Sequence, residues 1–564
     1  MSSRAADLKH LGDFEVSRRV LAIAALALPI GALSACVAWA LLRLIGLITN
    51  LVFYQRLGVG LVAPSGAHDA PLLILLAPVC GGLVIGLVAR FGSEKIRGHG
   101  IPEAIESILL AGSRIQPRVA LLKPLTAAIA IGTGGPFGAE GPIIMTGGAF
   151  GSISAQFLHL SADERKTLLV CGAAAGMAAT FDAPLASVLL AVELLLFEWR
   201  PRSFIPVAAA VAVATALRVP LLGAGPVFPA PSGALHLDAA ALALCVAAGA
   251  LAGLLALLAT ALVYLAEDGY SRLPLHWMWW PAIGGLVIGL GGLAVPQALG
   301  VGYDVIAAEL NGSIGLHLIV GILIVKTLIW SLSLGSGTSG GVLAPMLMIG
   351  GALGGLEATV FPQVAPGFWP LIGLAGVLGG VMRSPLTGVV FPLELTHRYQ
   401  ALLPLLIAAT AAYAVSVLLL RRSVLTEKLA RRGVHLSREY SVDPLEVLFV
   451  GDVMSEESWP MPAGGAAPTT ADDGVPTTAD DGAPLVFADD TLRRVAYLMA
   501  ESGRTVLPVA ERGAPERPVG TIGLQQLLAG RLRDLDEERH RTRVLRPLEL
   551  LGLGREPRAE EAAA

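Results

Sequence analysis

The chain has 564 residues, of which 54% are hydrophobic and only 15% are charged, and its formal net charge at pH 7 is −4. Soluble domains average about 25% charged residues, so this composition excludes a soluble globular enzyme and a disordered scaffold. The lack of a basic excess also excludes a nucleic-acid-binding protein. We therefore predict an all-α polytopic membrane protein that is not an enzyme and needs neither a metal site nor a cofactor.

Four uncharged stretches are long enough to cross a bilayer, which takes about 20 mostly apolar residues. They are residues 20–42, 71–89, 239–266 and 400–420. Lysine and arginine residues precede the first stretch and follow the last, and such residues favour the cytoplasmic side. We expect a cytoplasmic segment at residues 1–15, a transmembrane domain at residues 16–435 in the cell membrane, and both termini in the cytoplasm.

Two sequence patterns recur about 200 residues apart. Residues 142–151 and 345–354 share Pro, Met, Gly-Gly-Ala and a final Gly at an offset of 203, and residues 184–194 and 385–395 share Pro-Leu, Val and Glu-Leu at an offset of 201. The pattern predicts two related halves, roughly residues 71–220 and 278–420. Paired broken segments in two such halves point to a transport site near the middle of the membrane. The sequence leaves open whether the halves are inverted.

Two acidic residues, Glu193 and Glu394, occupy equivalent positions in these halves. We interpret them as helix-end residues rather than as part of a transport path. Lys123, Lys326 and Arg383 are the basic residues that could pair with them or lie at the entrances of a path.

Glu140 is the only Asp, Glu, Lys or Arg between positions 124 and 162. A carboxylate at membrane depth costs several kcal/mol unless it is paired or solvated, and a desolvated acid takes up a proton readily. Pro142 suits the first turn of a helix, whose N–H groups would face Glu140 or an anion in its place. We predict a gate in which the charged carboxylate occupies an anion site and leaves it when protonated. The alternative is a glutamate that only complements the helix dipole.

Two other segments have the same pattern of glycines followed by a proline, at residues 98–102 and 335–345. Converging helix N-termini can replace the hydration shell of a small anion without a full positive charge, so binding stays loose. The second segment also matches G-x-G-x-x-G. We exclude a dinucleotide site because no charged residue occurs from 327 to 356 and no strand–helix–strand pattern surrounds the match.

Together these three segments resemble the CLC family of chloride channels and proton-coupled chloride exchangers, over roughly residues 15–435. Residues 98–102 are similar to the family's G-S-G-I-P, residues 138–142 to G-(K/R)-E-G-P, and residues 340–345 to G-G-I-F-A-P. The resemblance implies a homodimer whose subunits are inverted repeats of tilted, broken helices. It also implies that Glu140 is the gate for chloride and protons. The implied anion-binding residues are Gly98, His99, Gly100, Ile101, Pro102, Gly138, Ala139, Gly141, Val342, Leu343 and Leu425.

The chain departs from the family pattern at several of these positions. His99 stands where the family usually has a serine, Leu343 replaces a phenylalanine, and Leu425 replaces a tyrosine. Neither usual hydroxyl is therefore present. His99 could donate a hydrogen bond to the anion or could be bonded to a nearby carbonyl.

Leu194 stands where many exchangers of the family carry a second, proton-relaying glutamate. Leucine cannot carry a proton, so we slightly favour channel-like chloride passage over chloride/proton antiport. A third possibility is a secondary transporter for another solute, regulated by a nucleotide-sensing tail. Selectivity among chloride, nitrate and fluoride stays open.

The C-terminal region resembles a small α/β CBS domain at residues 436–530, with a flexible insert at 462–484. The resemblance makes an adenosine nucleotide a possible ligand of this module. Residues 531–564 are charged and then rich in Ala and Glu, which predicts a partly disordered tail.

Overall fold

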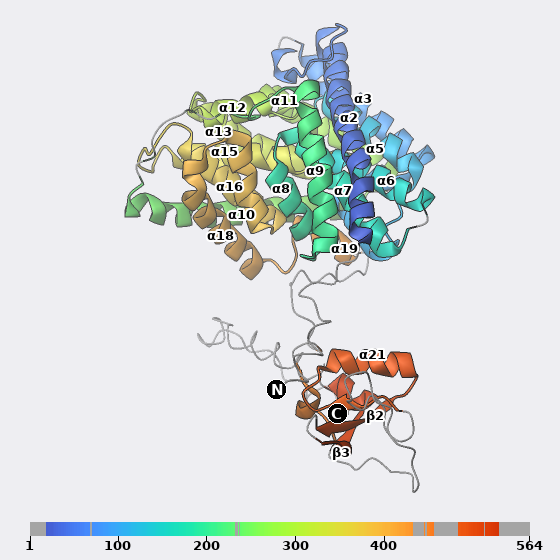
Figure 1. The fold of residues 1–564 in the computed structure, drawn as a ribbon. Helices are drawn as coiled ribbons and strands as arrows, with labels where there is room; N and C mark the ends of the chain where they lie inside the picture. Colours follow the sequence, from blue (N-terminus) through green and yellow to red (C-terminus); the bar gives the residue numbers. More distant parts are fainter. Residues whose placement is uncertain are drawn as a thin grey trace, which may run out of the picture. The chain divides into compact units, whose positions relative to one another are not determined.

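The structure is a computed structural model that describes residues 18–67, 70–158, 160–229, 231, 235, 237–431, 445, 448–455, 483–511 and 514–529. The chain divides into two compact units (Figure 1): one spans Phe14–Arg438, and the other combines Met1–Asp13 with Glu439–Ala564. The expected N-terminal segment 1–15 and the tail 531–564 lie outside the described residues. So does the insert 462–484, apart from its last two residues.

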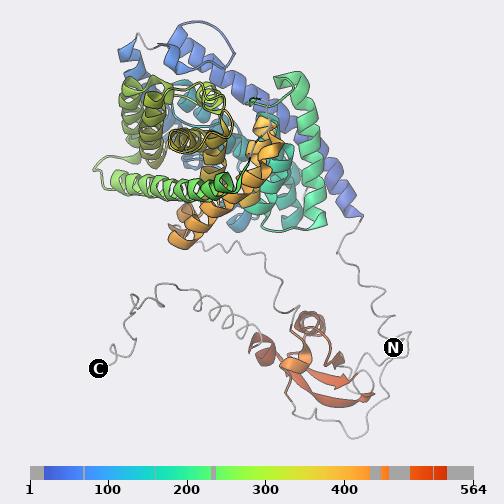
Figure 2. The same ribbon diagram turned by 90° about the vertical axis from the view of Figure 1, so that its left-hand side faces the viewer.

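The unit Phe14–Arg438 is built from helices throughout its described part, and these fall into two halves with a similar but not identical order of elements. The first half contains α2 (Arg19–Tyr54), η2 (Pro64–Ala67), α3 (Pro71–Phe91), η3 (Glu94–Ile96), α4 (Ile101–Leu110), α5 (Pro117–Gly132), α6 (Glu140–Phe157), α7 (Ala162–Phe181), α8 (Pro184–Leu190), η4 (Ala191–Leu196) and α9 (Pro201–Leu222). The second half contains α10 (Ala239–Ser271), η5 (Trp277–Trp279), α11 (Trp280–Ala294), η6 (Pro296–Ala298), α12 (Tyr303–Leu310), α13 (Leu316–Gly321), η7 (Ile322–Lys326), α14 (Thr327–Gly335), α15 (Leu343–Glu357), α16 (Phe368–Met382), α17 (Pro385–Thr396), η8 (Tyr399–Ala401) and α18 (Leu402–Leu419). The helix α19 (Val424–Arg431) follows. Figure 2 shows the two longest helices, α2 and α10, which open the two halves.

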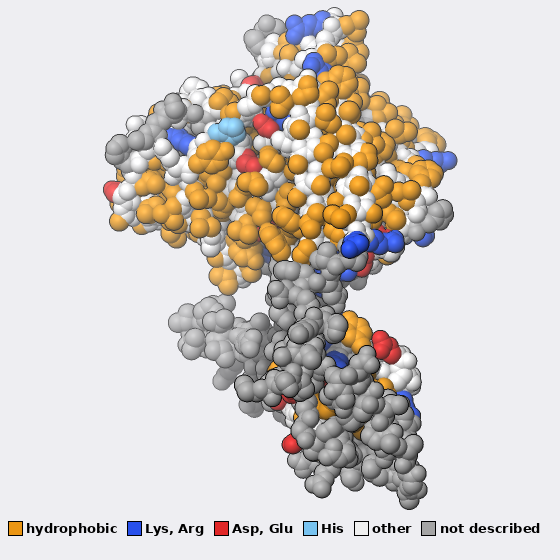
Figure 3. Space-filling model, viewed as in Figure 1, with side chains coloured by type: hydrophobic (Ala, Val, Ile, Leu, Met, Phe, Trp, Pro, Cys, Tyr) orange, Lys and Arg blue, Asp and Glu red, His pale blue; other side chains and the backbone are white. Residues whose placement is uncertain are grey.

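Seven helical segments in the described part of the chain are long and apolar enough to cross a membrane. The four apolar stretches that the sequence singles out lie within α2, α3, α10 and the segment Tyr399–Arg431, which confirms a polytopic membrane protein. Figure 3 shows hydrophobic side chains over most of one face of this unit. A membrane provides the apolar surroundings that such a surface requires.

Equivalent positions in the two halves make the same contacts. Each half buries one lysine whose ammonium donates to two backbone carbonyls of an earlier loop. The pairs are Lys123 with Ile96 and Gly98, at 2.8 and 2.6 Å, and Lys326 with Ala298 and Gly300, at 2.9 and 2.7 Å. The hypothesis that these lysines pair with Glu193 or Glu394 is therefore wrong, because carbonyls take that place. Arg383 likewise donates to backbone carbonyls at the end of α18, those of Ser416 and Leu420, at 2.8 and 2.6 Å.

The two recurring acids hold the halves together reciprocally. Glu193 accepts hydrogen bonds from the N–H groups of Leu386 and Thr387 in the first turn of α17, at 3.2 and 2.9 Å. Glu394 does the same with Leu185 and Ala186 in the first turn of α8, at 2.9 and 2.8 Å. Both acids thus satisfy N–H groups that a helix leaves free at its start, which agrees with their interpretation as helix-end residues. Such exchanged contacts are what an approximate two-fold relation between the halves produces, as in the expected inverted repeat.

The C-terminal unit contains a three-stranded sheet and a helix. The strand β1 (Val486–Phe487) pairs in parallel with β2 (Val506–Glu511), and β2 pairs antiparallel with β3 (Ala514–Gly523). The helix α21 (Leu492–Ser502) connects β1 to β2 and buries Leu492 and Val495 in the core of this unit. This arrangement is compatible with the small α/β domain that the sequence predicts.

Candidate functional site

The site lies where the starts of three helices meet, those of α4, α6 and α15. The loops before α6 and α15 pair through two equivalent glycines. The Gly341 N–H donates to the Gly138 carbonyl at 2.8 Å, and the Gly138 N–H donates to the Gly341 carbonyl at 3.4 Å. This short antiparallel pairing brings the first turns of α6 and α15 together from opposite halves of the chain.

The loop before α4 packs directly against the start of α6. A β-carbon built on Gly100 would lie 2.7 Å from the Gly141 carbonyl oxygen, and one built on Gly141 would overlap the carbonyl oxygen of His99. Gly98 and Gly100 also have φ values of +79° and +92°, which side chains other than glycine rarely adopt. The three glycine-rich segments therefore converge because glycine permits both the turns and the close approach.

Glu140 is the first residue of α6, and its side chain is 0% exposed. One carboxyl oxygen, Oε1, accepts a hydrogen bond from the Ala344 N–H in the first turn of α15. Among the described residues the other oxygen, Oε2, has no hydrogen-bond partner. A β-carbon on either Gly138 or Gly341 would overlap this carboxyl group, so the two paired glycines leave the space that it fills.

This geometry adds a second helix start to the expected gate. The sequence suggests that N–H groups of the helix that Glu140 itself begins would face the carboxylate. The carboxylate lies beside the N–H of Glu140 itself at the start of α6, and it also accepts a hydrogen bond from the first turn of α15, the equivalent helix of the other half. Val342 and Leu343, which precede Ala344 at this N-terminus, are each 1% exposed. First-turn N–H groups have no partner within their own helix, so the N-terminus of α15 is suited to binding an anion.

The remaining predicted residues lie at the starts of α4 and α6 and on α19. Ile101 and Pro102 open α4, and Ala139 immediately precedes α6. All three are buried. Leu425 is fully buried in α19, one turn before Lys428.

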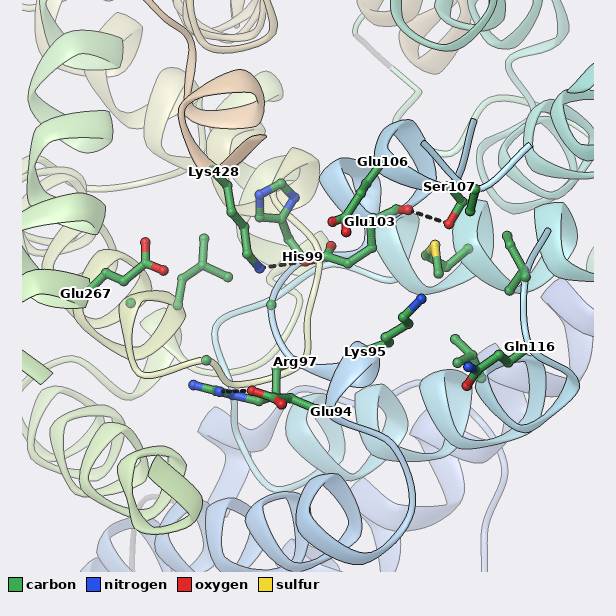
Figure 4. Close-up of a pocket in the computed structure, with 18 of the residues that line it drawn as sticks. Glu94, Lys95, Arg97, His99, Glu103, Glu106, Ser107, Gln116, Glu267 and Lys428 are labelled. Carbon is green, nitrogen blue, oxygen red and sulfur yellow. Dashed lines mark hydrogen bonds and ion pairs between the residues drawn. The ribbon is translucent and has the colours of Figure 1, made fainter. Parts of the chain in front are cut away.

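His99 faces a cavity of about 440 Å³ next to α4, shown in Figure 4. The side chain is 4% exposed, and its Nδ1 has no hydrogen-bond partner within the described ranges. The imidazole is therefore not anchored to a carbonyl through Nδ1.

Two charged residues of this cavity were not predicted from the sequence. Glu103 accepts a hydrogen bond from the Gly100 N–H at 3.0 Å and another from the ammonium of Lys428 in α19. An acid three residues after the residue that caps a helix is a recognisable sequence signal for the first of these bonds. The second joins residues 325 positions apart, for which the sequence has no local signal.

Comparisons with known proteins show what the chain is similar to. A family model described as "Voltage gated chloride channel" matches residues 80–417. The chain is 31% identical over 427 residues to a protein of Salmonella paratyphi A named H(+)/Cl(-) exchange transporter ClcA, which covers 69% of this chain and 87% of that protein. It is also 27% identical over 370 residues to a Ralstonia nicotianae protein whose name describes it as a ClcB-like chloride channel protein. This match covers 63% of this chain and 85% of that protein.

The fold has a counterpart among solved structures. The crystal structure of a slow cyanobacterial Cl-/H+ antiporter matches with a TM-score of 0.65 at 21% identity, covering 74% of this chain and 99% of that one. At this identity the match shows a common fold of tilted and broken helices.

Proposed function

Because the chain belongs to the CLC family of voltage-gated chloride channels, we propose that it exchanges chloride for protons across the membrane. Glu140 is the group that serves both ions in this proposal. The observation that carries it is the position of the Glu140 carboxyl, which is fully buried and bonded to the Ala344 N–H while its Oε2 has no partner among the described residues.

A buried carboxylate at the N-terminus of α15 occupies the place of a small anion. The partial positive charge of the helix start and its free N–H groups stabilise negative charge there. Protonation of Glu140 removes that charge, weakens the bond to Ala344 and lets the side chain leave. Chloride can then bind the same N–H groups, and its departure lets the deprotonated carboxylate return. One site therefore alternates between an anion and a proton carrier.

Exchange is now favoured over the channel-like passage that Leu194 suggests. The Salmonella relative is named as an exchanger, and the cyanobacterial protein of similar fold is an antiporter. Leu194 is 0% exposed and cannot carry a proton. We infer that protons reach Glu140 in this chain by a route that does not use the side chain at position 194.

The test is a flux measurement on the purified protein in liposomes that carry a chloride gradient and a proton-sensitive dye. Uphill proton movement driven by chloride is the expected result, and Glu140→Gln should abolish it while chloride still moves. Glu164→Gln is the matched control, because Glu164 also lies in the first turn of a helix, α7, but outside the site. Chloride flux without any proton movement in the unaltered protein would overturn exchange. Equal coupling in Glu140→Gln and the unaltered protein would overturn the role of Glu140.

We further propose that the protein is a homodimer in the cell membrane with both termini in the cytoplasm. Leu185 and Leu386 support an apolar contact face, because they are 65% and 48% exposed at equivalent positions of the two halves. Light scattering in detergent should give the mass of two chains, and protease should cleave the C-terminal region only from the cytoplasmic side. A monomer, or cleavage from the outside, would contradict this assignment.

For the C-terminal unit we propose a CBS-like regulatory module that binds an adenosine nucleotide. The support is the order of its elements, with a parallel pair of strands joined through α21 and a third strand antiparallel to them. Calorimetric titration of the full-length protein with ATP and with AMP should show binding to one of the two. Heat changes no larger than those with guanosine nucleotides would contradict nucleotide sensing.

A further inference from the structure

The cavity beside α4 contains charges that the gate at Glu140 does not use. Glu103, Lys428 and His99 lie on its wall (Figure 4). Glu103 is 5% exposed, and both of its carboxyl oxygens accept hydrogen bonds, one from the Gly100 N–H and one from the Lys428 ammonium. Because Lys428 belongs to α19, this ion pair joins α19 to the first turn of α4, directly after the loop that packs on the start of α6.

Glu103 binds these donors as a free anion would. A helix N-terminus and an ammonium are both donors that attract small anions. The side chain of Lys428 is 18% exposed and therefore remains in contact with the cavity. The buried ammonium of Lys123 lies nearby on the carbonyls of Ile96 and Gly98, so two ammonium groups surround one carboxylate. The wall of the cavity as a whole is balanced in charge, because Glu94, Glu106 and Glu267 face Lys95, Arg97 and Arg114. At Glu103 itself, an anion that takes the place of the carboxylate would keep these ammonium groups neutralised.

The second half of the chain has the same loop without the ion pair. Gly300 and Gly302, the equivalents of Gly98 and Gly100, also have positive φ values, of +66° and +83°. Lys326 holds that loop as Lys123 holds the first one. The residue at the same spacing as Glu103 is Val305, which has no charge. The loop geometry therefore does not depend on such a pair, and the Glu103–Lys428 pair needs another explanation.

We propose that the Glu103–Lys428 ion pair is a latch on the route by which the transported anion reaches the site. The anion replaces the Glu103 carboxylate on the Lys428 ammonium, so that one negative charge is exchanged for another and the ammonium stays neutralised. His99 also lines the cavity, and its imidazole provides the next donor. Its buried Nδ1 has no hydrogen-bond partner in the described part of the chain. This inference rests on the proposed anion transport and adds Lys428 and Glu103 to its path.

The experiment measures chloride flux in liposomes as a function of chloride concentration, at constant ionic strength maintained with isethionate. Glu103→Gln keeps an acceptor for the Gly100 N–H but removes the competing charge, so the half-saturating chloride concentration should fall about fivefold. Lys428→Met leaves Glu103 as an unpaired negative charge, so the same quantity should rise by at least about fivefold. Lys428→Arg keeps the charge and should stay near the unaltered protein.

Asp268→Asn is the matched control, because it breaks an ion pair with Arg431 on the same helix, α19, and Asp268 does not line the cavity. Half-saturating concentrations for Glu103→Gln and Lys428→Met equal to that of Asp268→Asn would overturn the latch. If Glu103→Gln does not fold, the comparison of Lys428→Met with Lys428→Arg decides the question alone. Failure of the proposed function is distinguishable, because it appears as unchanged proton coupling in Glu140→Gln.

Discussion

The substitution Gly138→Ala should push the Glu140 carboxyl out of the start of α15. A β-carbon built on Gly138 overlaps both carboxyl oxygens of Glu140, and the three heavy atoms nearest to it all belong to that side chain. Gly138 is not among the glycines with positive φ, so alanine fits its backbone conformation. The end of a flexible glutamate side chain can move away without a shift of the backbone, so the fold should remain intact.

The magnitude follows from the bond that is lost. A hydrogen bond to a charged group contributes about 1.5–3 kcal/mol, and the Glu140–Ala344 bond is of this kind. A loss of 1.4 kcal/mol changes an equilibrium tenfold, so the carboxylate should occupy the anion site at least about tenfold less often. Proton coupling should then fall toward that of Glu140→Gln. Proton coupling in the double variant Gly138→Ala/Glu140→Gln should be no lower than in Glu140→Gln alone, because both changes act on the same interaction.

The assay is the liposome flux measurement, with thermal unfolding in detergent as the check on folding. Gly148→Ala is the matched control, since Gly148 is also on α6 and a β-carbon there would meet only Leu169, at 3.2 Å from its side-chain Cδ2. If Gly138→Ala folds normally and keeps full proton coupling and pH dependence, the carboxyl does not act from the position described here.

Two further predictions concern the contacts that the halves share. Lys123→Met and Lys326→Met should each lower the free energy of unfolding by about 2–4 kcal/mol, because each leaves two buried carbonyls without a donor. Chemical denaturation in detergent measures this free energy. A loss of stability in only one of the two variants would contradict the equivalence of the two lysines. Glu193→Gln and Glu394→Gln should each cost about 1–2 kcal/mol by weakening bonds to helix N-termini while leaving the ratio of chloride to protons unchanged. A changed ratio would instead place these acids on the transport path.

Much of the site could be predicted from local patterns. Glycines before a helix start and a lone acid in an apolar stretch indicate the three N-termini and Glu140, because those features depend only on neighbouring residues. The repeat between the two halves could also be predicted, because equivalent helix starts in the two halves use similar short sequences. These are short-range signals, and the structure brings the residues that carry them together.

The partners of these residues could not be predicted, because they come from distant parts of the chain. The bond between Glu140 and Ala344 depends on the pairing of Gly138 with Gly341, and nothing near Gly138 in the sequence indicates which glycine it meets. The same holds for Lys428 and Glu103. Buried lysines were expected to pair with acids, but Lys123 satisfies its ammonium with carbonyls that the turn at Gly98 happens to expose.

The pairing of Gly138 with Gly341 has a consequence for biosynthesis. Gly138 and Gly341 belong to different halves, so a nascent chain that has inserted α6 still lacks the N–H donor for the Glu140 carboxylate. Ala344 must leave the ribosome and α15 must dock before that acid is sheltered. Until then a partly made subunit holds an unprotected carboxylate in the lipid, which should delay its stable insertion and expose it to quality-control proteases.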